Sequence, residues 1–291
     1  NDIDAFIEET EVIADSSSAF ISVTANSNSE LISVGLGAAV VVAGEANPAI
    51  GGSMSINSIA NSVDAHIKES RKIEAGEDVI VRASQADVLV TVAGGVADSL
   101  GSTAVGGSFA YNFVGGQFDL ANPDVIDRDS DETNAIHASI EDSRVVAGGD
   151  VTVDAGYQEL GPDYLTDLEV DLWSESEEDN IAFEMDALSD DDKSEFNSSQ
   201  IVSVAFAGGV ANNVAVSGSV TVNFVAHDID AEIIGGRHVE ADGSIRVSAV
   251  DDVKVTSIAG SAAVGNTAAG AGASLQIDRS QVDATIGANT N

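Results

Sequence analysis

Apolar and other residues alternate along most of this chain, and this alternation predicts β-strands. Residues 79–83 read Val-x-Val-x-Ala, and residues 220–224 read Val-x-Val-x-Phe. A period of two is typical of a strand, because successive side chains point to opposite faces. Gly, Asn, Asp and Ser bound the alternating segments, and only three prolines interrupt the whole chain. We therefore predict an all-β fold.

The predicted strands recur with four motifs in a constant order. An aliphatic residue followed by Asp-Ala-x-Ile occurs at residues 3–7, 63–67, 229–233 and 282–286, with a degenerate copy ending at Ile140. A Gly/Ser-rich segment that alternates up to an Asn occurs at residues 51–57, 106–112 and 217–223. An Ala-Gly-x-Asp-Val type of turn occurs at residues 75–79, 147–151 and 241–245. Ala/Gly-rich strands occur at residues 92–97 and 206–211. This recurrence indicates an internal repeat.

The motif spacing gives about four repeats of roughly 52–60 residues. A right-handed parallel β-helix (β-solenoid) accommodates such a period, with about three coils of roughly 18–20 residues in each repeat. We expect residues 1–291 to form a single β-solenoid fragment. The alternative is a β-propeller with four-stranded blades, which we rank lower because Trp and aromatic blade signatures are missing.

Two acidic insertions interrupt the repeat, at about residues 115–133 and 157–199. The first contains five carboxylates at close spacing, Asp124, Asp127, Asp129, Asp131 and Glu132. We favour a solvated acidic turn for it. The alternative is that these residues bind Ca²⁺, which prefers several carboxylate oxygens, although the turn Gly and distal Glu of an EF-hand are absent. They are the best metal candidates in the sequence.

The second insertion contains the only Trp, Trp173, in a segment that alternates like a strand. Helical spacing follows from Ser176, a candidate helix cap, to Leu188. We favour a loop whose apolar residues serve its own packing against the body. The alternatives are a partner-binding arm or a calcium-ordered flap, with calcium or a glycan as ligand.

The net charge of −38, from 49 acidic and 11 basic residues, excludes several classes of partner. Such a surface repels nucleic acid and anionic membranes. Abundant Asp and scarce Lys are typical of halophilic proteins, in which salt screens the self-repulsion. The chain has no cysteine, and aromatics make up only 4% of it, which suits thin layers of small side chains. It opens without a signal peptide, so we expect an internal piece of a longer protein.

No catalytic constellation can be recognised, and we predict that the chain is not an enzyme. The remote alternative is a β-helical enzyme that acts on polysaccharides. The basic residues are scattered, and the four histidines show no metal-ligand spacing. His66 occupies the variable position of the Asp-Ala-x-Ile motif, which predicts an outward-facing residue that is not a ligand. The Asp residues of that motif also face outward. At three coils, or roughly 14 Å, from one copy to the next, they would lie too far apart to share an ion.

The motifs at residues 106–112, 217–223, 63–67, 229–233, 76–79 and 148–151 resemble the repeats of leukotoxin-type filamentous adhesins, which are giant bacterial surface or secreted proteins. The resemblance covers most of the chain outside the insertions. It implies a β-helical stalk, secretion to the cell surface or the extracellular space, and a role in adhesion or surface structure. Its partners would be neighbouring repeats of the same chain and a cell-surface glycan or protein. The shared motifs are structural and bring no functional residues.

Overall fold

The structure is a computed structural model that describes residues 1–42, 47–100, 102–115, 134–157, 200–235 and 238–287. Strands make up 79% of these residues and no helix occurs among them, so the predicted all-β fold is confirmed. In the described part of the chain, accordingly, no apolar helix is long enough to cross a membrane. Both predicted insertions fall almost entirely outside the described residues.

The strands form four sheets, A to D, in which every pairing is parallel. Sheet A consists of β1 (Asp2–Glu8), β5 (Ser62–Lys68), β9 (Asn134–Glu141), β14 (His227–Ile234) and β19 (Gln281–Ile286). Sheet B consists of β2 (Glu11–Ala14), β6 (Lys72–Ala75), β10 (Val145–Ala147) and β15 (Val239–Ala241). Sheet C consists of β3 (Ile21–Val41), β7 (Val79–Ser99), β11 (Val151–Tyr157), β12 (Ile201–Ala211), β16 (Ile245–Asp251) and β17 (Val255–Val264). Sheet D consists of β4 (Ala49–Ile59), β8 (Thr103–Val114), β13 (Val214–Val225) and β18 (Thr267–Asp278).

Each repeat passes through the sheets in the order A, B, C, D and then returns to sheet A. Equivalent strands of successive repeats pair in register, so that Asp4 lies opposite Asp64 and Asn57 opposite Asn112. Equivalent residues are therefore one strand spacing apart, about 4.8 Å. This corrects our expectation of three coils in each repeat, and of about 14 Å between motif copies. The period is long because the strands of sheet C are long.

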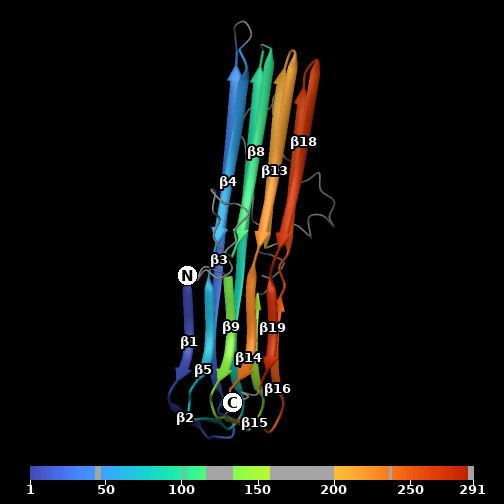
Figure 1. The fold of residues 1–291 in the computed structure, drawn as a ribbon. Helices are drawn as coiled ribbons and strands as arrows, with labels where there is room; N and C mark the ends of the chain where they lie inside the picture. Colours follow the sequence, from blue (N-terminus) through green and yellow to red (C-terminus); the bar gives the residue numbers. More distant parts are fainter. Residues whose placement is uncertain (43–46, 101, 116–133, 158–199, 236–237, 288–291) are drawn as a thin grey trace.

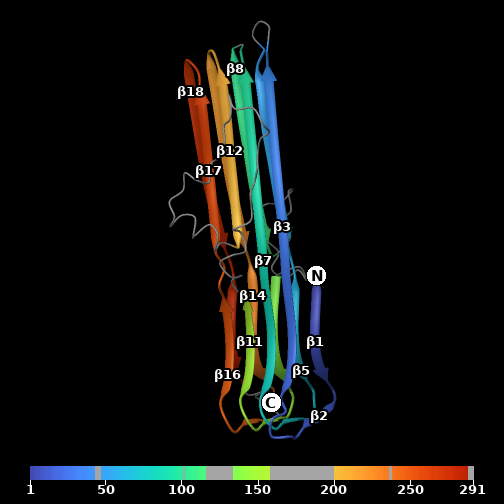
Figure 2. The same cartoon turned by 180° about the vertical axis from the view of Figure 1, so that it is seen from behind.

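The four sheets build an elongated, two-layered body (Figures 1 and 2). Sheets D and A form one layer, with D above A in Figure 1. Sheet C forms the other layer and extends along most of the length, as Figure 2 shows. Sheet B connects the two layers at the lower end, where the strands curl into a half-barrel.

The lower half of the body has an aliphatic core. The inward residues of the Asp-Ala-x-Ile motif supply one wall of it, and Val63, Ala65 and Ile67 are all 0% exposed. They pack with sheet B and the lower part of sheet C, for example with Ile73 and Val81. Each fully buried Val or Ile contributes about 1.5–3 kcal/mol relative to an exposed position. The motif is therefore a core-forming element of sheet A.

The upper half brings sheets C and D unusually close together, and the Gly-Gly pairs of the sequence make this possible. A Cβ atom added at Gly95 would lie 1.9 Å from the carbonyl oxygen of Gly107 in the facing sheet. A Cβ at Gly106 would lie 2.0 Å from the carbonyl oxygen of Gly208. Side chains in these positions would collide with backbone, which cannot move aside without separating the sheets.

Between the close sheets runs a row of asparagines, which end the Gly/Ser-rich motif. The side-chain nitrogen of Asn57 donates to Oδ1 of Asn112 at 3.2 Å, and that of Asn112 donates to Oδ1 of Asn223 at 3.1 Å. Hydroxyls of sheet C face this row, with Ser203 at 2.8 Å from Asn112 and Ser257 at 2.8 Å from Asn223. Hydrogen bonds between amides thus join three successive repeats in the upper interior.

Large apolar side chains of the upper half face outward. In sheet D, Ile50 is 71% and Met54 63% exposed; in sheet C, Val34 is 48% and Leu36 46% exposed. Their inward neighbours are small or polar. The alternating pattern therefore marks strands correctly throughout, but its apolar face points to the core only in the lower half.

Gly95 and Gly107 provide a matched test of the close approach between sheets C and D. We expect Gly95→Ala to lower the free energy of unfolding by at least about 2 kcal/mol, because the new methyl group meets backbone. Gly107→Ala should change it by less than about 1 kcal/mol, since the nearest atom to its Cβ is 4.0 Å away. Denaturant unfolding measures both, and equal effects would show that the two sheets are not so close.

Candidate functional site

The outer face of sheet A gathers titratable side chains from all the repeats. The register places the Asp position of the motif in one row, which is Asp4, Asp64, His137, Asp230 and Asp283. The variable position forms the next row, which is Phe6, His66, Ser139, Glu232 and Thr285. The rows are adjacent because alternate residues of a strand share a face. Groups distant in sequence therefore become close neighbours.

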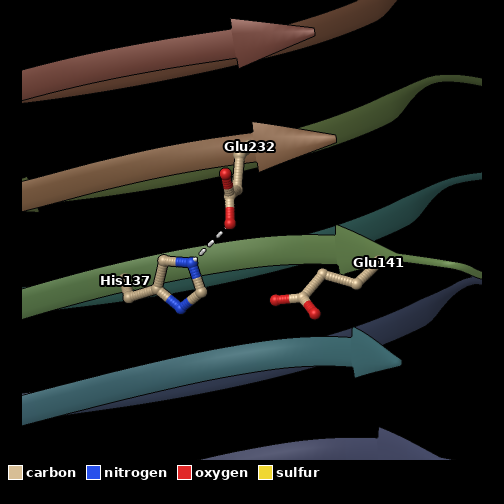
Figure 3. Close-up of side chains that lie close together, drawn as sticks. All are labelled: His137, Glu141 and Glu232. Carbon is tan, nitrogen blue, oxygen red and sulfur yellow. Dashed lines mark hydrogen bonds and ion pairs between the residues drawn. The ribbon is translucent and has the colours of Figure 1, made fainter. Parts of the chain in front are cut away.

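His137 is the centre of this face. Its Nδ1 lies 2.9 Å from Oδ2 of Asp64 on β5, and its Nε2 lies 3.1 Å from Oε1 of Glu232 on β14. The side chain is only 28% exposed. Figure 3 shows Glu232 above the ring and Glu141 to one side of it. One imidazole thus connects three successive repeats.

His66 extends the network toward the first strand. Its Nδ1 contacts Oδ1 of Asp64, so this carboxylate is shared by two histidines, and its Nε2 lies 3.0 Å from Oε1 of Glu8. The ring also stacks on Phe6, with centroids 5.5 Å apart. His66 does face outward, as the sequence predicted.

The carboxylates favour the protonated form of both rings. The hydrogen bond to Asp64 outweighs burial and, with that to Glu232, raises the pKa of His137 to about 9. Burial opposes the charge of His66, but its bonds to Asp64 and Glu8 still raise its pKa. The pKa of Asp64 is lowered, since hydrogen bonds from the two rings exceed the effect of burial. At neutral pH His137 is therefore an imidazolium between two carboxylates.

Two more carboxylates complete the surroundings of His137. Glu141, also on β9, pairs with Nζ of Lys68 at 3.1 Å and accepts a hydrogen bond from Ser139 at 3.3 Å. Asp230 lies beside His137 in the same row, and its pKa is raised by burial and by the nearby charge of Asp228. Histidine and glutamate together are a ligand set for a transition metal. In the described part of the chain, one group has its ligand atoms within 4.8 Å of one another: His137, Glu141 and Glu232.

The sequence missed this site because the assumed spacing was wrong. With three coils in each repeat the repeated Asp residues would be too distant to act together, whereas they occupy neighbouring strands. His137 stands at the Asp position of the degenerate motif copy, and aligning the repeats one strand apart would have placed it between Asp64 and Asp230. The carboxylates predicted for Ca²⁺ (Asp124, Asp127, Asp129, Asp131 and Glu132) lie outside the described residues, so that site stays a prediction.

A second gathering of charges lies on the outer face of sheet C. Arg82 pairs with Asp154 at 3.0 Å, and Arg246 lines the same hollow of about 450 Å³, which opens beside Gly156. The sequence does not predict that these two arginines line one hollow, because they belong to different repeats. The hollow is shallow and shares no residue with the His137 network.

The raised pKa of His137 predicts a pH-dependent stability. A group with a raised pKa stabilises the fold below its unfolded value of about 6.5, and this contribution is lost as the pH rises through its folded value. We expect the free-energy difference between wild type and His137→Gln to fall by about 2–3 kcal/mol between pH 6.5 and 9.5. Urea unfolding in EDTA measures it.

As a control, His238→Gln removes an exposed histidine next to sheet B and should keep the wild-type pH dependence. A difference between wild type and His137→Gln that stays constant over this range would show that the ring is not held as imidazolium.

No family model, no curated protein and no solved structure matches this chain. The interpretation of the outer face of sheet A therefore rests on its own geometry. Any functional proposal for the chain likewise rests on its sequence and its structure.

Proposed function

We propose that this chain is a segment of a right-handed parallel β-solenoid that serves as a structural, adhesive stalk of a large extracellular repeat protein. The observation that carries the proposal is the register. In all four sheets, the strand of one repeat pairs with the equivalent strand of the next. A protein built this way grows by adding repeats, and its length is not fixed by a central site.

The strand edges support the same proposal. At one end of the stack, β3 and β4 pair with β7 and β8 on one side, and no other described strand pairs with their far edges. An open edge as long as β3 is a site of association unless something covers it. Further repeats of the same kind are the partners that fit such an edge, because each repeat already receives its neighbour in register.

The interior of the stack supports a structural role as well. The Asn57–Asn112–Asn223 row joins three successive repeats through equivalent amide–amide hydrogen bonds. Stability then accumulates from one interface to another. The acidic composition and the absence of cysteine are compatible with an extracellular place, and the motifs resemble adhesin repeats. Nucleic acid and anionic membranes are unsuitable partners for a net charge of −38.

Duplicating one repeat tests this proposal. A second copy of residues 228–280, inserted between Ser280 and Gln281, should continue sheets A, B and D by one strand and sheet C by two, because Asp228 already pairs with Gln281. We expect new amides protected from hydrogen exchange in the inserted copy, and a higher denaturation midpoint. The matched control inserts the same residues in scrambled order.

The scrambled insert should stay unprotected and leave the midpoint unchanged or lower. If the true duplicate behaved like the scrambled insert, the chain would be a fold of fixed size, and the stalk proposal would be abandoned.

A further inference from the structure

Three side chains on the outer face of sheet A converge as metal ligands do. His137 and Glu141 come from β9 of one repeat, and Glu232 comes from β14 of the next. One ligand atom from each lies within 4.8 Å of the other two, and all three residues are partly buried. Figure 3 shows the two carboxylates approaching the imidazole from different sides. The space between them is bounded by donors on neighbouring strands.

His137 already has the orientation that a ligand needs. A metal-bound histidine usually gives its other ring N–H to a carboxylate, which fixes the tautomer and the plane of the ring. Asp64 occupies that position, with Oδ2 at 2.9 Å from Nδ1, so that Nε2 is directed at Glu232. Ser139 likewise holds one oxygen of Glu141 at 3.3 Å. Asp64 and Ser139 therefore already orient two of the three ligands, His137 and Glu141.

We propose that His137, Glu141 and Glu232 bind one divalent transition-metal ion of the Zn²⁺ type, through Nε2 and one oxygen of each carboxylate. Water fills the fourth position. Zn²⁺ bonds of about 2.0–2.2 Å place tetrahedral ligand atoms about 3.4 Å apart, and Nε2 and Oε1 of Glu232 are 3.1 Å apart already. Imidazole nitrogen favours Zn²⁺, Cu²⁺ or Ni²⁺, whereas Ca²⁺ and Mg²⁺ take oxygen ligands.

Such an ion would join two neighbouring repeats from outside the core. It is independent of the stalk proposal and differs from the predicted Ca²⁺ loop in its residues and in the metal. Lys68 lies at the rim, where its Nζ is 3.1 Å from Oε2 of Glu141 and competes with the ion for that carboxylate. Removing Lys68 should therefore strengthen binding, and removing His137 should weaken it.

Zn²⁺ titration of the whole chain by calorimetry tests the proposal. Excess CaCl₂ and NaCl occupy the other carboxylates, and histidine ¹⁵N spectra identify the ligating nitrogen. We expect one Zn²⁺ per chain and a shift of Nε2 of His137. His137→Gln should weaken binding at least about 100-fold, and Asp64→Asn by about 10–100-fold. Lys68→Gln should tighten it severalfold.

His238→Gln is the matched control, because it removes a histidine that pairs only with Glu240 among the described contacts, away from sheet A. It should bind Zn²⁺ as the wild type does. Glu232→Gln provides a second ligand variant, and circular dichroism checks that every variant is folded. If His137→Gln and Glu232→Gln both bound Zn²⁺ like the wild type, or if Nε2 of His137 did not shift, the site would be refuted.

Discussion

Parallel backbone hydrogen bonding between equivalent strands is the interaction on which the rest of this structure depends. It holds each residue about 4.8 Å from its counterpart in the next repeat, in all four sheets. A substituted side chain therefore lies next to the residues at the same motif position in the neighbouring repeats. Whatever a motif position contains becomes a continuous row along the stack.

The rows explain why the two halves of the body use different chemistry. In the lower half, stacked Val, Ala and Ile side chains fill the space between sheets A and C, and they are fully buried. In the upper half, stacked glycines let the sheets approach until no large side chain fits between them. The asparagines then bond to one another from repeat to repeat, so these buried amides leave little hydrogen-bonding capacity unpaired.

The same constraint creates the chemistry of the outer face. A row of aspartates at one strand spacing would concentrate negative charge, and His137 interrupts that row between Asp64 and Asp230. Its protonated ring relieves the repulsion on both sides. A metal ion at the same position would do so with a larger charge. The raised pKa of His137 and the proposed metal site both arise because one imidazole stands in a row of carboxylates.

The all-β class, the repeat and the outward position of the motif aspartates could be predicted from the sequence, because period-two alternation depends only on local geometry. The number of residues that one repeat uses to pass once through the four sheets could not be predicted from the sequence. A strand such as β7, with 21 residues, contains no signal that separates one long strand from two short ones. That error hid the His137 site. The alternation at residues 220–224 marked a strand but not its inner face, because Thr221 and Asn223 point inward there.

Spin labels on neighbouring repeats give the most direct test of this register. The chain has no cysteine, so Ser62→Cys and Ala135→Cys introduce two labels at positions that face each other on β5 and β9. One repeat per strand spacing predicts strong dipolar and exchange broadening, at a backbone separation of about 5 Å. A spectrum with no exchange broadening and only the weaker dipolar broadening of labels about 14 Å apart, as expected when three coils intervene, would contradict the account.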